Sequence, residues 1–212
     1  MVMKYANVEF ALTRSGKWPN QTQGLIDLKT GCFIMPMGIY CNIDYVGDGR
    51  AVVYRFNDDF SINCGLFNIK TGYEIAPLDY TSIGSFSEGL ALASKGQFVE
   101  YGYIDIEGTK ITEFIYDYFS EPFMNGLARV GCDGKWGLIN KKGDWVLEPY
   151  YDYIDKYINE YAVVGLRIDE NQEHGGSGAE ISFGELKCGI IKIKSGELIM
   201  PYIYSSAILS LW

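Results

Sequence analysis

Short runs of apolar residues alternate with polar ones along the chain, and this pattern recurs in five copies. Each copy contains a phrase made of a glycine, two apolar residues and a second glycine six or seven positions after the first. The phrases occupy residues 24–31, 65–72, 102–108, 137–143 and 189–196. A repeated unit of roughly 20–50 residues predicts an array of one small supersecondary element.

Within a copy, the apolar residues follow the two-residue period of a half-buried strand, as in Tyr103-Ile-Asp-Ile106. We expect four short strands per copy. The first carries an alanine, the second follows the first glycine, the third ends at a proline and the fourth is rich in tyrosine. The alanines are Ala11, Ala51, Ala91, Ala128 and Ala162, and the prolines are Pro36, Pro77, Pro149 and Pro201, with Phe114 in the third copy. The second glycine of each phrase supplies the positive φ of a tight hairpin turn.

The spacing of these landmarks separates a constant part of the unit from a variable one. From the first glycine of one copy to the alanine of the next, the distance stays between 25 and 27 residues. From each alanine to its own glycine it ranges from 9 to 27 residues. Because surface loops tolerate insertions and packed strands do not, the connection between the first two strands forms a variable rim.

The array predicts an all-β fold of one repeat domain, 1–212, with units at about 5–45, 46–84, 85–120, 121–156 and 157–212. Five four-stranded antiparallel units favour a small five-bladed β-propeller-like ring, with an open β-solenoid as the alternative. Residues 150–161 have apolar positions at both helical and strand spacing, and register with the other copies favours a strand and a turn.

The fourth copy resembles a known family. Phe-Met-Asn-Gly-Leu-Ala-Arg-Val at 123–130, Gly-Lys-Trp-Gly-Leu-Ile-Asn-Lys-Lys-Gly at 134–143 and Val-Leu-Glu-Pro-Tyr-Tyr-Asp at 146–152 are similar to the WG (KWG) repeat of bacterial proteins. The third copy matches well, whereas Gln23, Cys64 and Cys188 replace the tryptophan in the other three. The resemblance implies a bacterial all-β repeat protein without known catalysis or a defined ligand. A weaker similarity runs to choline-binding cell-wall repeats.

Composition narrows the class of partner. The net charge of −9 and pI of about 4.7 disfavour binding to nucleic acid or anionic membranes. The start of the chain lacks an apolar signal region, and the five cysteines show no paired spacing, so we expect a cytoplasmic protein without disulfides. Cys64 and Cys188 stand where other copies have an aromatic residue, and we expect both to be buried.

Candidate chemistry is sparse, and the sequence predicts no enzyme, cofactor or metal site. The single histidine, His174, lies in a polar, glycine-rich segment that does not hold an imidazole for general-base catalysis. Carboxylate pairs, Asp58 with Asp59 and Asp152 with Asp155, would suit glycoside hydrolysis only at a defined separation across a cleft. Four aromatic residues could stack on sugars or bases, but their fixed repeat positions favour packing between units. They are Tyr101, Tyr103, Trp136 and Trp145.

The leading functional hypothesis is a non-catalytic protein-interaction module that binds a basic protein partner through acidic rim loops. An immunity or antitoxin-like protein is one concrete form. The loops at 56–63 and 167–187 supply the candidate residues Asp58, Asp59, Asp169, Glu170, Glu173, His174 and Glu180. Acidic loops on a rigid scaffold can steer a basic partner. The alternatives are a glycan or cell-wall binder and, least favoured, a carboxylate-based hydrolase.

Overall fold

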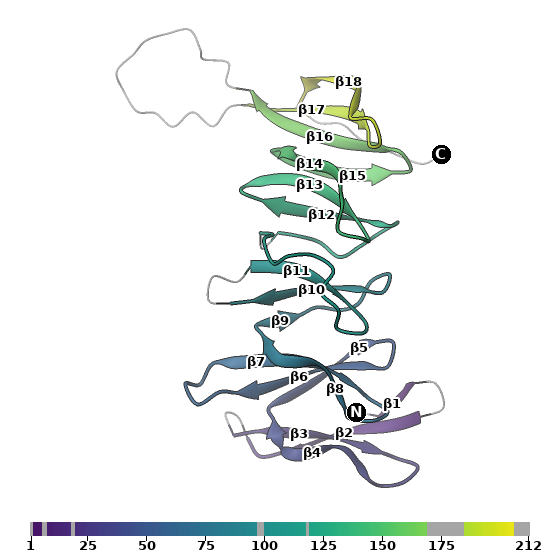
Figure 1. Cartoon of the computed structure of the whole chain (residues 1–212), viewed down its shortest axis with the longest axis vertical. Helices are drawn as coiled ribbons and strands as arrows, with labels where there is room; N and C mark the ends of the chain where they lie inside the picture. The colour runs from purple at the N-terminus through teal and green to yellow at the C-terminus, as the bar shows by residue number, and fades with distance from the viewer. Residues whose placement is uncertain are drawn as a thin grey trace. The chain divides into compact units, whose positions relative to one another are not determined.

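The protein is all-β, as the sequence predicts. A computed structural model describes residues 2–5, 8–17, 20–96, 100–117, 119–168 and 185–205. In this part of the chain it contains β-strands and no helix (Figure 1). The chain divides into two compact units. The first comprises Met1–Tyr118 and Pro122–Asn125, and the second comprises Phe119–Glu121 and Gly126–Trp212.

The first unit contains three antiparallel sheets, which we call A, B and C. Sheet A consists of β1 (Val2–Tyr5), β2 (Val8–Ser15), β3 (Thr22–Asp27) and β4 (Phe33–Tyr40). Sheet B consists of β5 (Asn42–Gly47), β6 (Arg50–Phe56), β7 (Ile62–Asn68) and β8 (Glu74–Tyr80). Sheet C consists of β9 (Ser82–Ile83), β10 (Leu90–Lys95) and β11 (Glu100–Asp105). Consecutive strands are neighbours in every sheet.

The second unit contains sheets D and E with the same meander order. Sheet D consists of β12 (Leu127–Cys132), β13 (Lys135–Asn140) and β14 (Trp145–Tyr151). Sheet E consists of β15 (Tyr153–Ile158), β16 (Tyr161–Ile168), β17 (Glu185–Lys192) and β18 (Glu197–Tyr204). The ambiguous stretch 150–161 therefore forms strand and turn, as register with the other copies favoured. The turn glycines of the five phrases, Gly31, Gly72, Gly108, Gly143 and Gly196, all have the expected positive φ.

The tyrosines predicted for a separate fourth strand instead end the outer strand of their own sheet, as Tyr80 does in β8 and Tyr204 in β18, and the strand that follows belongs to the next sheet. β5, β9 and β15 pair with β6, β10 and β16, and only one residue separates each of them from the strand before. The amide of that linking residue already bonds the next sheet, as in Cys41 N to Tyr54 O (2.9 Å) and Asp152 N to Gly165 O (3.0 Å). The predicted unit boundaries therefore lie about one strand too late. Sheets C and D have three named strands rather than four in the described part of the chain.

The prolines were expected at the end of the third strand, where a strand end or an edge suits proline; the strand end is wrong and the edge position is confirmed. Pro77 lies inside β8, whose pairing with β7 skips from Leu66–Ala76 to Cys64–Tyr80. Between these pairs one residue of β7, Gly65, faces three residues of β8, 77–79, which is a bulge. Proline fits there because β8 is an edge strand, so its missing N–H breaks no ladder bond. β14 and β18 show the same register shift around Pro149 and Pro201.

The bulge explains the first glycine of each phrase. A Cβ on Gly65 would lie 2.8 Å from Ala76 O and 3.0 Å from Leu78 N, both backbone atoms. Gly137 and Gly189 would meet Leu147 O at 2.7 Å and Met200 O at 2.6 Å. These glycines lie within their strands, not ahead of them as expected. They are required because the outer strand crosses directly over them.

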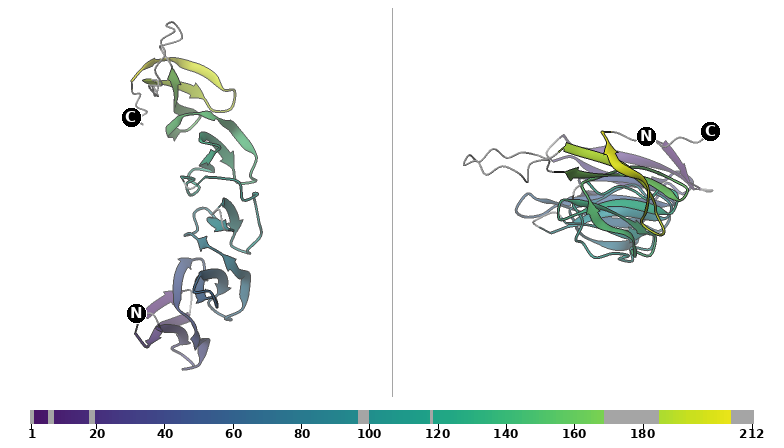
Figure 2. Two further views of the ribbon diagram at one scale, coloured as in Figure 1. Left: turned by 90° about the vertical axis from the view of Figure 1, so that its left-hand side faces the viewer. Right: turned by 90° about the horizontal axis from the view of Figure 1, so that it is seen from above.

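Successive sheets of a unit pack face to face and share their cores (Figure 1, Figure 2). Between sheets A and B lie Phe10, Leu25, Met35, Tyr40, Ile43, Ala51, Val53, Phe67 and Ile69. Between B and C lie Val52, Cys64, Leu66, Ala76, Tyr80, Ile83, Ala91, Ala93 and Ile104. Between D and E lie Leu138, Leu147, Tyr151, Ile154, Tyr157, Ala162, Val164, Ile191 and Ile193. Closure of the sheets into a ring stays a prediction.

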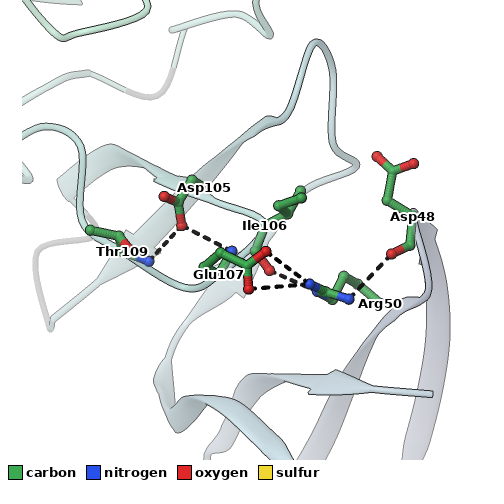
Figure 3. A network of polar contacts seen from close by, with 6 residues as sticks. All are labelled: Asp48, Arg50, Asp105, Ile106, Glu107 and Thr109. Carbon is green, nitrogen blue, oxygen red and sulfur yellow. Dashed lines mark hydrogen bonds and ion pairs between the residues drawn. The ribbon is translucent and has the colours of Figure 1, made fainter. Parts of the chain in front are cut away.

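Polar contacts also tie neighbouring sheets together at their turns (Figure 3). Arg50, at the start of β6, donates from Nε to Ile106 O at 2.7 Å and pairs with Glu107 at 3.2 Å. Both partners lie in the turn after β11, and Asp105 fixes that turn by accepting the Thr109 amide at 2.7 Å. The Arg50 side chain is only 13% exposed, so this contact joins sheets B and C at a partly desolvated position.

Replacing a glycine under a bulge tests this packing. We expect Gly65→Ala to destabilise the protein by about 3 kcal/mol or more, because backbone atoms of β8 must move. Gly31→Ala is the matched control, since its Cβ meets nothing within 4 Å and only its positive φ of 70° opposes the change, at about 1–2 kcal/mol. Urea unfolding measures both. An equal or smaller loss at Gly65 would contradict the close approach.

Candidate protein-binding loops

The variable connections lie between the second and third strands of the four-stranded sheets A, B and E. The length of this connection differs between sheets: in sheet D it consists of Asp133 and Gly134 alone, whereas in sheet B residues 57–61 connect β6 to β7. The longest connection, after Ile168 and before Glu185, falls outside the described residues. The candidate residues Asp169, Glu170, Glu173, His174 and Glu180 all lie in it and stay predictions.

The loop at 57–61 is held in one conformation by its own hydrogen bonds. Asn57 N donates to Ser61 O at 2.8 Å, and Phe60 N donates to Asn57 O at 3.0 Å. The side chains of Asn57 and Ser61 bond each other at 2.8 Å. Because both ends of the loop continue into paired strands, its tip is presented from a rigid base.

The two acidic residues predicted in this loop have different roles. Asp59 Oδ1 accepts hydrogen bonds from Ser61 Oγ at 2.6 Å and from Ser61 N at 3.0 Å. These bonds lower the pKa of the Asp59 carboxyl from its usual value, and the bond from the Ser61 hydroxyl has the larger effect. Asp59 therefore shapes the turn, whereas the neighbouring Asp58 is exposed.

Phe60 at the tip of this loop is the residue that sequence reasoning missed. Its side chain is 86% exposed, and its φ is +64°, a conformation that costs an L-residue about 1–2 kcal/mol. The adjacent Ile62 is 43% exposed. Phe60 thus combines a bulky exposed ring with a backbone conformation that is uncommon for such a residue. The only sequence signal was its position in a loop that had been chosen for charge.

A second feature is an open hollow of about 580 Å³ at the end of β16 in the second unit. It is lined by Lys135, Pro149, Tyr150, Asp152, Leu166, Arg167 and Ile168. Asp152 is bound there by Lys135 Nζ at 2.7 Å and by the Arg167 amide at 2.9 Å. Burial alone would raise its pKa, but these bonds and charges outweigh it and lower the pKa. Asp152 is thus held as an ion-paired carboxylate, which does not suit the general acid of glycoside hydrolysis.

Two of the four aromatic residues singled out in the sequence, Trp136 before Gly137 and Tyr103 after Gly102, serve packing. Trp136 is half-buried, with the Phe119 ring at 6.3 Å and the Arg129 guanidinium 5.1 Å from its ring. Arg129 in turn donates to Asp155 O at 2.9 Å and pairs with Glu121. Tyr103 is fully buried against Phe123 at 4.9 Å. Packing, rather than an open stacking platform, is therefore what these two positions provide.

The copies that lack tryptophan fill its position in other ways. Cys64 and Cys188 are buried, as expected. Gln23 is also buried and links sheet A to sheet B, donating to Asn42 Oδ1 at 2.9 Å and accepting from Ile43 N at 3.2 Å. Each replacement thus preserves contact around the glycine without an indole.

Among the described residues, no group of three or more His, Cys, Asp or Glu side chains could hold a metal ion. No helix in that part of the chain is long and apolar enough to cross a membrane. These statements cover the described residues and leave 169–184 aside.

Comparison with known families identifies the repeat. The model of the WG containing repeat matches residues 65–97, 101–136 and 136–166. Residues 65–97 and 101–166 therefore carry WG repeats, as the sequence resemblance implied for the third and fourth copies. The three matches begin in sheet B and end in β16 of sheet E, and they include the Trp136-Gly137 pair. A comparison with curated proteins finds no match.

Solved structures resemble the chain only distantly. Kluyveromyces lactis Hsv2 is 12% identical with a TM-score of 0.41, covering 91% of this chain and 59% of its own. A puromycin hydrolase is 10% identical with a TM-score of 0.39, covering 96% of this chain and 37% of its own. The chain thus spans less than two thirds of either protein. Similarity at this level assigns neither a fold nor a function.

The buried thiol gives a direct check of the packing. Burial raises the pKa of Cys64 to about 12, and the thiolate is the reactive form. We expect Cys64 to resist alkylation in the native protein at about pH 8, while the exposed Cys32 reacts. Peptide mass spectrometry after alkylation distinguishes the two. Equal labelling before unfolding would contradict the burial of Cys64.

The strain at Phe60 predicts an unusual mutant. We expect Phe60→Gly to leave the stability unchanged or to raise it by up to about 1 kcal/mol, because glycine adopts positive φ without a Cβ penalty. The control Phe67→Ala removes a ring that is 4% exposed and should cost about 3–5 kcal/mol. Thermal unfolding reports both values. A loss of more than about 1 kcal/mol at Phe60 would assign the ring to packing.

Proposed function

We propose that this protein is a non-catalytic interaction module that holds a basic protein partner through the loops between the inner strands of its sheets. Phe60 carries the proposal. Its ring is 86% exposed on a hydrogen-bonded loop and is kept there against the backbone cost of a φ of +64°. Aromatic anchors presented without further ordering are the residues that dominate binding energy at protein interfaces.

Charge supports a basic partner. The chain has a net charge of −9, and the exposed Asp58 lies two residues before Phe60 in the same loop. The connection after Ile168 adds Asp169, Glu170, Glu173 and Glu180 in sequence. Clustered acids accelerate encounter with a basic surface and fix its orientation. The proposed partner therefore offers an apolar pocket for Phe60 with lysine or arginine around it.

An immunity or antitoxin-like protein that caps a basic toxin in the cytoplasm would meet this description. WG repeats suit the role because a packed sheet array holds the loops while their length and sequence vary. In this proposal the hollow beside Asp152 has no catalytic task. The ion pair with Lys135 gives Asp152 a structural partner.

The experiment is affinity capture from the source cells, with the bound proteins quantified by mass spectrometry. Three forms of the protein serve as bait: the wild type, Phe60→Gly, and a variant with Asp58→Asn, Asp169→Asn, Glu170→Gln and Glu173→Gln. We expect one basic protein to be recovered by the wild type, about tenfold less by Phe60→Gly, and less still by the neutralised variant. Raising the salt concentration should release it.

A matched control removes a similar charge elsewhere. Glu74→Gln, Glu148→Gln and Glu197→Gln neutralise exposed carboxylates on the outer strands β8, β14 and β18. This variant should capture the partner as the wild type does. Equal loss in both charge variants would reduce the effect to net charge and contradict a loop-specific site. Recovery of glycan instead of protein would support the cell-wall alternative.

A further inference from the structure

The two faces of each sheet have distinct roles in the packing. We call the face that packs on the following sheet the forward face, and the face that packs on the preceding sheet the back face. In sheet B, Leu66, Ala76 and Tyr80 lie on the forward face, toward sheet C. Val53 and Ile69 lie on the back face, toward sheet A. The A–B, B–C and D–E interfaces all join a forward face to a back face.

The forward face of sheet E is open at positions that are closed in the other sheets. Tyr204 ends β18 and is 44% exposed, whereas the tyrosines at the same place in A, B and D are at most 9% exposed. Ile199 is 51% exposed, and Met200 and Ile190 are half-buried. The equivalents of Met200, which are Met35, Ala76 and Leu147, are all buried. Val163 and Cys188 stay buried, so the open part is β18 together with Ile190 of β17.

The back face of sheet A is open in the same way. Leu28 is 45% exposed, whereas its equivalents Ile69 and Ile193 are 1% and 3% exposed. Ala11, Thr13 and Ile26 are half-buried, although the corresponding residues of the other sheets are buried. Those buried equivalents include Ala51, Val53 and Phe67 in sheet B and Ala162, Val164 and Ile191 in sheet E.

We propose that a second copy of this chain covers these faces, head to tail, so that the forward face of sheet E binds the back face of sheet A in the next copy. The argument is continuity with the interface already present. Three internal interfaces join the same two kinds of face, and the two open faces are its unmatched halves. A head-to-tail contact is heterologous, so it propagates beyond a dimer unless the copies close into a ring.

The net charge of −9 on each copy opposes this association through long-range repulsion. Salt screens that repulsion and leaves apolar burial unaffected or stronger. Self-association should therefore increase with ionic strength, the opposite of the salt dependence expected for a basic partner. This proposal does not depend on the proposed function and uses none of the loop residues.

Sedimentation equilibrium of the whole chain tests the proposal, from low to high micromolar concentration and at two salt concentrations. We expect the average mass to rise above that of one chain with concentration, and further at high salt. Tyr204→Lys on the forward face and Leu28→Lys on the back face should each lower the association constant at least about tenfold. Circular dichroism confirms that each variant is folded.

Mixing the two variants gives the sharpest result. Tyr204→Lys keeps an intact back face and Leu28→Lys keeps an intact forward face, so an equimolar mixture should form dimers but nothing larger. The matched control is Ile203→Lys in the same strand. Ile203 is 63% exposed, and its equivalents Ile39, Asp79 and Tyr150 are exposed in their sheets too. It should associate as the wild type does.

A strict monomer at every concentration overturns the proposal. Association that survives both lysine variants, or a mixture that forms no dimer, also overturns it. Loss of the Phe60-dependent partner would leave these results unchanged, so the two proposals fail separately.

Discussion

The structure depends on one close contact, between the repeat glycine of an inner strand and the bulged outer strand that crosses it. At Gly65, Gly137 and Gly189 a carbonyl oxygen of the outer strand lies only 2.6–2.8 Å from the position that a Cβ atom would occupy. This approach lets the outer strand turn across its own sheet and end at a tyrosine. One residue later, in sheets B and D, the chain enters the next sheet. The glycine thus couples the shape of one sheet to the start of the following one.

The residue before the glycine can vary because its neighbours compensate. In sheet D the large Trp136 pairs across the strands with Gly131, and in sheet B the small Cys64 pairs with the large Tyr54. Each pair thus combines one large and one small residue, in opposite order. Cys188 faces Gly165, and there Leu186 and Tyr153 approach the space left free, at 3.0 and 3.2 Å from a Cβ built on that glycine. Cross-strand pairs of this kind are the unit of sheet stabilisation. The family signature can therefore lose its tryptophan and keep its fold.

Much of the fold could be predicted from the sequence because glycine and alternation report backbone geometry directly. The five phrases, the all-β class and the positive φ of glycines such as Gly72 are confirmed. The course of the third strand was not predictable, because Pro77 reads as a strand end unless the strand is known to be an edge with a bulge. The tyrosines taken for a fourth strand end the third strand instead, since a bulge lengthens that strand in a way that residue types do not show.

The candidate site shows the same limit. Asp58 and Asp59 were chosen as candidates for their charge. In the structure Asp59 stabilises the turn through its hydrogen bonds to Ser61, whereas Asp58 is exposed. Phe60 was passed over because an aromatic residue in a strand-rich sequence reads as core, and its φ cannot be inferred from residue type. The hollow near Asp152 combines residues from four strands or links, which sequence spacing does not bring together.

The central claim is that each repeat glycine lies beneath a bulge of the outer strand, and proton NMR tests it most directly. The account predicts strong nuclear Overhauser contacts from the Gly65 Hα protons to the Leu78 amide proton, and equivalent contacts from Gly137 and Gly189 to their outer strands. A regular ladder without these contacts, in which residues of β7 and β8 pair one to one past Pro77, would contradict it.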